Sequence, residues 1–145
     1  MRLKILFGII FLLFIAGLLN FNLNPSREVS NEALQQFLVI PEEATQLQTY
    51  QFGRGMTMAR GMYIKFRLPS DSMNTLFDAM CIKAEELSPT YRLQLDSFPE
   101  VPSWFSPTSE NTSGGTCWTV YYAIYKIIVE NQQSENVIYI VISVL

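Results

Sequence analysis

Alternation between hydrophobic and polar residues predicts β-strands in four parts of the chain. These parts are also rich in β-branched and aromatic residues: 45–52, 58–68, 116–130 and 136–145. The first carries mostly Gln, Thr and Tyr, so we expect it at the edge of a sheet. A further short strand is expected at 91–95, inside an otherwise irregular stretch that spans 88–115.

A helical period occurs between 70 and 87, where apolar residues recur at steps of three and four. The stripe that they form contains Met73, Leu76, Phe77, Met80, Cys81, Ala84 and Leu87. A helix of two turns is also predicted at 31–37, with Ser30 or Asn31 as its N-cap. The expected fold is therefore α+β, an antiparallel sheet of about four strands in ββα–ββ order with one main amphipathic helix packed on one face.

The last two predicted strands can pair in two registers, and the two registers bury different faces. With Glu130 opposite Val137, one face is aliphatic. That face gathers Ile127, Ile138, Ile140 and Ile142. A slip by one residue places Lys126 and Glu130 among these isoleucines, and burying an unpaired charge is costly. We therefore predict the first register, with the helix packed on the isoleucine face.

The opposite face of the predicted sheet combines cations with large aromatic side chains. Its members are Tyr63, Lys65, Arg67, Trp118, Tyr122, Lys126 and Tyr139. Aromatic residues and Arg are favoured at the centres of interfaces, so this face is a candidate surface for an anionic or carbohydrate-like ligand, lipid headgroups or a protein partner. The alternative is that the N-terminal segment or the 88–115 loop covers it, with the Lys and Arg stems lying along apolar surface.

Three glycines and two arginines occur together just before and within the second predicted strand, in the sequence GRGMTMARG. A glycine-rich loop could cradle an anion, yet no helix follows at once to offer its N-terminus to a phosphate. The preferred interpretation is a β-hairpin with its loop at 53–57 and a bulge or bend at Gly61. Arg54 and Arg60 remain candidate binding residues; Arg60 has the parity of the core face and requires that bend to point outward.

Two cysteines are present, Cys81 on the helix stripe and Cys117 with the parity of the isoleucine face. A disulfide between them is consistent with an exported domain and would stabilise it by about 3–4 kcal/mol through loop entropy. Two buried free thiols are the alternative.

The N-terminus combines two basic residues, Arg2 and Lys4, with an apolar segment that spans 5–23. As a helix this segment would be roughly 28 Å long, close to the thickness of the hydrocarbon core of a bilayer. We expect a signal anchor at 1–23, a tether at 24–30 and one exported domain at 31–145. The N-terminus would lie in the cytoplasm, and the membrane contact would be made by 5–23. A cleaved signal peptide and a secreted domain are the alternative.

Charge and composition limit the chemistry of the exported part. The residues after Leu23 include eight Lys or Arg and thirteen Asp or Glu, a formal charge of −5, which does not suit nucleic acid. The chain has no histidine, so histidine-based nucleophile pairs are excluded and neither a metal nor a cofactor is expected. We expect a binding or interaction module for an envelope protein or an anionic ligand. A small enzyme that uses carboxylates, Tyr or Ser, or an accessory subunit of a membrane complex, are the alternatives.

Overall fold

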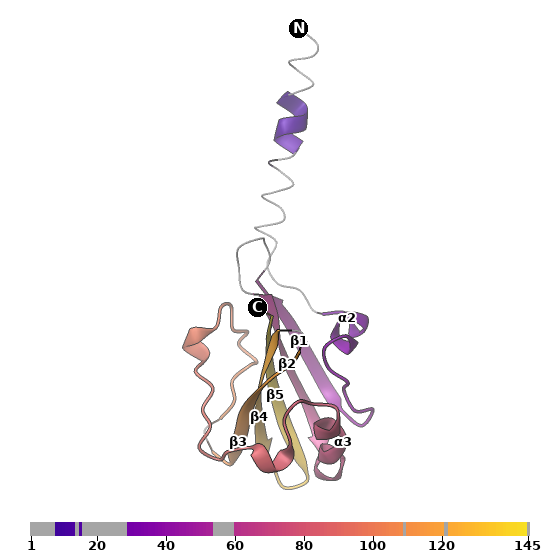
Figure 1. Cartoon of the computed structure of the whole chain (residues 1–145), viewed down its shortest axis with the longest axis vertical. Coiled ribbons are helices and arrows are strands. Elements are labelled where there is room, and N and C mark those ends of the chain that lie inside the picture. Colours follow the sequence, from indigo (N-terminus) through magenta and orange to yellow (C-terminus); the bar gives the residue numbers. More distant parts are fainter. Residues whose placement is uncertain are drawn as a thin grey trace.

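The structure is a computed structural model of the chain, and it describes residues 8–13, 15, 29–53, 60–108, 110–120 and 122–144. Its centre is an antiparallel five-stranded sheet in the order β1-β2-β5-β4-β3 (Figure 1). The strands are β1 (Thr45–Phe52), β2 (Arg60–Pro69), β3 (Thr112–Trp118), β4 (Ala123–Asn131) and β5 (Glu135–Val144). The predicted edge position of the first strand is confirmed, because β1 pairs with β2 alone.

The prediction of one long strand at 116–130 is wrong. The chain turns between Trp118 and Ala123, and β3 and β4 form a hairpin. The turn is closed by a hydrogen bond from the backbone N–H of Thr119 to the carbonyl of Ala123, and Tyr122 adopts a positive φ of 59°. Thr, Val and Tyr all have high β propensity, so the residues of this turn do not interrupt the strand pattern. The short strand expected at 91–95 is also absent, since residues 91–94 have no regular structure.

The predicted register of the C-terminal hairpin is confirmed. Glu130 lies opposite Val137, and Ile127 lies opposite Ile140. Strand β2 continues the same rows across the sheet, with Ile64 opposite Ile140. The rows build the aliphatic core on one face, whose fully buried members include Ile64, Phe66, Leu68, Leu76, Ile127, Ile138, Ile140 and Ile142.

Two short helices, α2 (Asn31–Gln35) and α3 (Met73–Asp78), lie on this face. Ser30 caps α2 through its side chain, as predicted. The long helix predicted for 70–87 is wrong in extent, because α3 ends at Asp78 and only a 3₁₀ turn follows at 84–86. Ile82 explains the difference. It is buried in the core, although in a continuous helix it would point away from the stripe.

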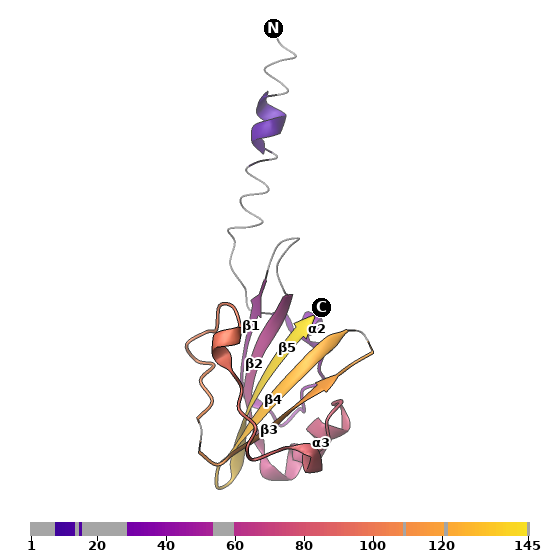
Figure 2. The ribbon, with the colours of Figure 1, turned by 60° about the vertical axis from the view of Figure 1, so that its left-hand side comes forward.

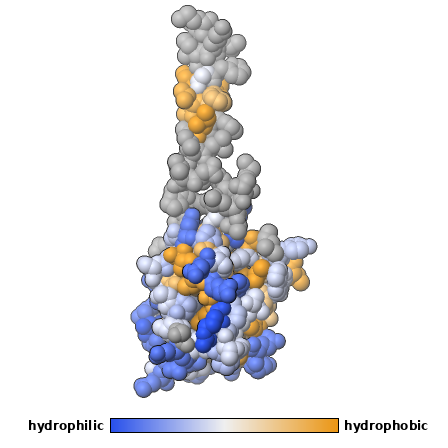
Figure 3. Space-filling view, turned by 90° about the vertical axis from the view of Figure 1, so that its left-hand side faces the viewer, coloured by the Kyte–Doolittle hydropathy of each residue, from blue (hydrophilic) through white to orange (hydrophobic). Residues whose placement is uncertain are grey.

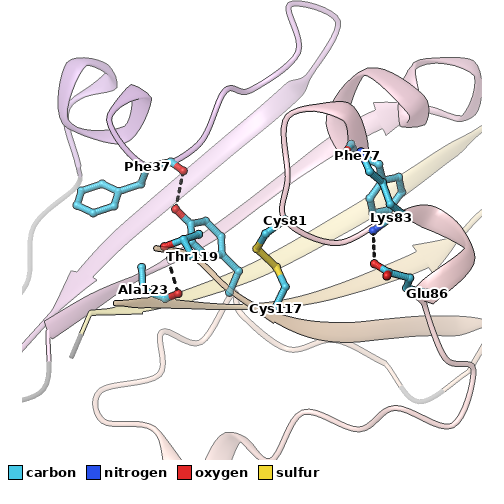
Figure 4. Close-up of a disulfide and its surroundings, with 9 residues drawn as sticks. Phe37, Phe77, Cys81, Lys83, Glu86, Cys117, Thr119 and Ala123 are labelled. Atoms are coloured by element: carbon cyan, nitrogen blue, oxygen red, sulfur yellow. Dashed lines mark hydrogen bonds between the residues drawn. A yellow bond between two sulfur atoms is a disulfide. The ribbon is translucent and has the colours of Figure 1, made fainter. Parts of the chain in front are cut away.

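The disulfide between Cys81 and Cys117 is confirmed, with the two Cα atoms 5.8 Å apart (Figure 4). It joins the segment after α3 to β3. Cys117 packs against the aliphatic core opposite Tyr125. The β3–β4 turn preserves the parity predicted for Cys117, because an odd-numbered residue of β3 pairs with an odd-numbered residue of β4.

The second face of the sheet is also buried. Residues 91–105 run across it, on the side opposite α2 and α3 (Figures 1 and 2). They contribute Phe105 to a second core and cover its other members, which are Phe52, Tyr63, Ile128, Val137, Tyr139 and Val141. The face that we considered as an open surface is therefore covered, by part of the loop named in the alternative. The aromatic residues of that loop, Phe98, Trp104 and Phe105, provide the apolar area that covers it.

Most of the predicted anchor and tether lies outside the described residues. Residues 8–13 are helical, and Ile9 to Leu13 expose apolar side chains. Within the part of the chain that the structure describes, no helix has both the length and the apolar character needed to cross a membrane.

Candidate binding surface

Strands β1 and β2 on either side of the glycine-rich stretch pair antiparallel, as a hairpin requires, while the predicted loop at 53–57 lies outside the described residues except for Gly53. Gly53 follows β1 with a φ of 70°, which favours glycine. The bend predicted at Gly61 is wrong, because β1 and β2 pair regularly from Gln48 to Phe52. Gly61 instead makes room for a close neighbour: a Cβ atom there would lie 2.3 Å from Cζ of the Phe52 ring. The register shift occurs near the other end of β1, at Gln46, whose φ is 53°.

The arginines of this stretch do not form an observed cluster. Arg60 begins β2 and is exposed, whereas Arg54 lies outside the described residues.

Two of the predicted cations contact residues 91–105, which we call the covering segment. The Nζ atom of Lys65 donates a hydrogen bond to the carbonyl of Trp104 at 3.2 Å and lies 5.1 Å from the centre of the Tyr139 ring. Lys126 Nζ lies 4.6 Å from the centre of the Phe98 ring. Both lysines are partly buried, so their stems pack on the second core while their ammonium groups face aromatic rings.

Tyr63 lies at the centre of the second core with 0% of its surface exposed. Its hydroxyl donates to the carbonyl of Pro99 at 2.6 Å, and its ring packs between Phe52 and Phe105. Burial, more than the charge of Glu100, raises the pKa of Tyr63 above its ordinary value. In this structure Tyr63 therefore fastens the covering segment to the sheet.

Three predicted residues, Lys65, Arg67 and Tyr139, do come together in a polar cleft of about 410 Å³. The cleft lies beside the beginning of β1, where the second face is hollowed. Its other lining residues are Gln46, Leu47, Gln48, Phe66, Glu130, Gln132 and Val137. Figure 3 shows this side of the domain, on which hydrophilic and hydrophobic residues are interspersed.

Each charged residue that lines the polar cleft has a polar partner within the protein, and for Lys65 this is the carbonyl of Trp104. Arg67 forms a salt bridge with Glu135. Glu130, which is buried, accepts a hydrogen bond from the backbone N–H of Thr108 and another from the hydroxyl of Tyr139. Burial, followed by the negative charge of Glu130 and this hydrogen bond, raises the pKa of Tyr139 to about 12. Tyr139 is thus neutral, and its proton is already donated to Glu130. Because carboxylates lie beside the cations, the cleft suits a ligand that is neutral or carries both signs rather than a simple anion.

A second hollow, the apolar groove, lies against the opposite side of β1. It has a volume of about 440 Å³ and is lined by Leu34, Gln35, Val39, Ile40 and Leu47. Val39 is 62% exposed, and Leu47 also lines the polar cleft. Strand β1 is thus flanked by an apolar groove and a polar cleft.

The two edges of the sheet differ in their backbone contacts. On β3, Ser88 exchanges two backbone hydrogen bonds with Gly114, of 2.8 and 3.0 Å. On β1, no backbone group among the described residues pairs with the outer edge. An edge of this kind is a template for another strand.

The last predicted candidates, Trp118 and Tyr122, lie apart from the cleft. They flank the β3–β4 turn and are 64% and 74% exposed. Sequence reasoning did not identify the pairing of Glu135 with Arg67, the burial of Glu130 or the two hollows beside β1. The Gln-rich composition of β1 was the available signal, since it marks a strand with a solvated side.

Comparisons with protein-family models, with curated proteins and with solved structures found no significant match to this chain.

Proposed function

We propose that this chain is a membrane-anchored interaction module whose exported domain binds an extended polypeptide segment along the edge of β1. The observation that carries the proposal is the outer edge of β1, which pairs with no backbone group in the part of the chain that the structure describes and lies between the apolar groove and the polar cleft. In such binding, backbone hydrogen bonds supply affinity and pockets for alternate side chains supply specificity.

The two hollows define the sequence of the bound segment. Successive side chains of a strand point to opposite faces of a sheet. A strand added to β1 would therefore direct every second side chain toward Leu34 and Val39, and the others toward Gln48 and Arg67. The ligand is an extended segment in which aliphatic residues alternate with residues that carry amide, hydroxyl or mixed charged groups.

The position of the cleft agrees with an anchored module. Arg67 lies seven residues along β2 from Arg60, roughly 23 Å at the rise of a strand. The described chain reaches the domain at Val29, whose N–H donates to the hydroxyl of Thr49, opposite Ile64 in the middle of β2. Figures 1 and 2 place the helical residues 8–13 beyond the Arg60 end, and a domain tethered from that side presents the cleft away from the membrane. The basic and apolar pattern of 1–23 and the disulfide, which is typical of exported proteins, support the anchor.

The proposal can be tested with synthetic octapeptides that alternate aliphatic and polar residues, added to the full chain in detergent. A binding peptide should slow the hydrogen exchange of backbone amides in 45–52, and methylation of alternate peptide nitrogens should abolish binding because it removes the backbone donors. Val39→Asp should weaken binding about tenfold or more. Val120→Asp, at a valine that is also exposed but lies at the β3–β4 turn, is the matched control and should bind normally.

Two results would contradict the proposal. The first is that no peptide of this class protects β1. The second is that binding is indifferent both to Val39→Asp and to methylation of the peptide backbone. A stoichiometric membrane partner that binds with β1 unprotected would favour an accessory subunit instead.

A further inference from the structure

The end of the sheet opposite the polar cleft carries a group of exposed apolar side chains. They belong to β3, to the β3–β4 turn and to the segment after α2. Their exposed fractions are 64% for Trp118, 86% for Val120, 74% for Tyr122 and 37% for Phe37. A hollow of about 370 Å³ lies among these elements and is lined by Phe37, Val120 and Ala123.

The fold holds this group in place. The hydroxyl of Tyr125 donates to the carbonyl of Phe37 at 2.7 Å, which ties the segment after α2 to β4. The backbone N–H of Tyr122 donates to the carbonyl of Thr119, and Thr119 is bonded in turn to Ala123. Figure 4 shows Phe37 close to Thr119 and Ala123. Hydrogen bonds therefore join the segment after α2 to β4, and Thr119 to Tyr122 and Ala123, where the exposed side chains lie.

The register identifies which end of the molecule this is. Arg60, Val144 and Ala123 lie in one row of the sheet, and Trp118 pairs one residue further along, with Ile124. Gly53 follows β1 at the same end, since Phe52 lies opposite Gly61. Figures 1 and 2 both place the helical residues 8–13 beyond this end of the sheet.

We infer that Trp118, Val120, Tyr122 and Phe37 form a second membrane contact, which inserts into the interfacial region of the bilayer that holds the anchor. The inference rests on the membrane anchor of the proposed function. Trp and Tyr have an apolar ring with a polar tip and concentrate at the membrane–water interface. The apolar residues of 5–23 direct a bilayer, rather than a second protein, to this end of the domain.

The contact has a structural consequence for the proposed binding site. One tether alone leaves a domain free to rotate relative to the membrane. A second contact at the β3–β4 turn orients the strands, so that the polar cleft and the beginning of β1 face away from the lipid surface.

The chain contains two tryptophans, which allow a matched experiment. Trp104→Phe leaves Trp118 as the fluorescent reporter, and Trp118→Phe leaves Trp104. The backbone of Trp104 is bonded to Lys65, which lies five residues along β2 from Arg60, roughly 16 Å at the rise of a strand. Each full-length variant is reconstituted into phosphatidylcholine vesicles with and without bromine near the headgroup end of the acyl chains, and bromine quenches only tryptophan that enters the bilayer.

Brominated lipid should reduce Trp118 emission about twofold or more and Trp104 emission by less than about a tenth, because only Trp118 lies at the interface. Val120→Glu should reverse most of the quenching of Trp118, whereas Val39→Glu, at an exposed valine beside β1, should not.

The outcomes separate this inference from the proposals on which it rests. Vesicle flotation with unquenched Trp118 overturns the second contact and leaves the anchor standing. Failure of the chain to float overturns both. Equal quenching of Trp118 and Trp104 also overturns the inference, because the domain would then lie on the lipid in no fixed orientation. A crosslinked second protein at the turn, with Trp118 unquenched, assigns the surface to a protein. Peptide binding at β1 is measured in detergent, so its result does not depend on the quenching experiment in vesicles.

Discussion

One face of the sheet is buried by aliphatic side chains beneath α2 and α3, whereas aromatic rings beneath 91–105 bury the other. The first cover is also joined to β3 by a disulfide. The second is held by polar contacts, including the bond from the Tyr63 hydroxyl to the Pro99 carbonyl and that from Lys65 to the Trp104 carbonyl. The comparison shows that both faces of one sheet can be buried by apolar packing, while the cover of one is fixed by a covalent link and that of the other by hydrogen bonds from Tyr63 and Lys65.

The largest effect is expected from the aliphatic face. Ile140→Ala should lower the free energy of unfolding by about 2–5 kcal/mol, because Ile140 is fully buried in the centre of the sheet and the smaller side chain leaves a cavity. Denaturant unfolding followed by circular dichroism measures the change. Val39→Ala, at an exposed position, is the control, and a loss no greater than in that variant would contradict the packing described here.

The disulfide gives the next effect. Replacing Cys81 and Cys117 by Ser should cost about 3–4 kcal/mol, since the bond closes a loop between residues 36 positions apart. Reductant should destabilise the natural chain and leave the double variant unchanged. Labelling of two thiols without reductant, at unchanged stability, would contradict the bond.

Alkaline pH should weaken the second face more than the aliphatic face, because two of the three described tyrosines with a raised pKa lie on the second face. The pKa values of Tyr63 and Tyr139 are both raised, that of Tyr139 to about 12. Their contribution to stability is complete below the ordinary tyrosine pKa of about 10 and is lost as the pH rises toward the folded-state pKa, because the unfolded chain loses its protons first. Stability should therefore fall between about pH 10 and 12.

Tyr125 on the aliphatic face also has a raised pKa. Single variants are therefore needed to measure how much each tyrosine contributes to the fall of the free energy of unfolding with pH. Tyr63→Phe should lower stability by about 0.5–1.5 kcal/mol at neutral pH and make the alkaline decline less steep. Trp104 emission in the Trp118→Phe background follows release of the covering segment. A Tyr63→Phe variant with an unaltered pH profile would contradict the assignment.

The smallest effect is expected at Lys126. Lys126→Met keeps most of the apolar stem and removes the charge above the Phe98 ring, so the loss should be about 0.5–1 kcal/mol. Chemical denaturation at low and high salt measures it. Because the stem still packs, a loss as large as that of Ile140→Ala would show that this contact has been misjudged.

The sequence predicted the structure correctly where side chains alternate regularly between the two faces of a strand. Alternation assigned Met62 and Ile64 to the core face, and the cost of burying Lys126 selected the register that the structure has. The same reasoning failed at the β3–β4 turn, because turn residues with strand propensity leave the period unbroken. The same reasoning predicted too long a helix after Ser72, whereas α3 ends at Asp78. A stripe of apolar residues indicates which side chains are buried, but it does not show that they belong to one continuous helix.

The candidate site was predicted only in part. Lys65, Arg67 and Tyr139 were identified because they share one face of neighbouring strands. The covering of that face, the pairing of Arg67 with Glu135 and the open edge of β1 depend on contacts between segments far apart in the chain. Contacts of this kind produce no repeating pattern along the chain, so they cannot be predicted from the spacing of residues.

By itself, the sequence determined the α+β class and the face to which each recognised strand residue points, including the core parity of Cys117; it favoured the disulfide without excluding two free thiols. These features follow from a side-chain period of two and from the cost of burying charge. Only the tertiary structure decided that the second face is covered, that the outer edge of β1 has no backbone partner among the described residues and that a polar cleft lies beside β1. Those outcomes depend on which surface the irregular segment 91–105 can bury, and this is set by the shape of the assembled sheet.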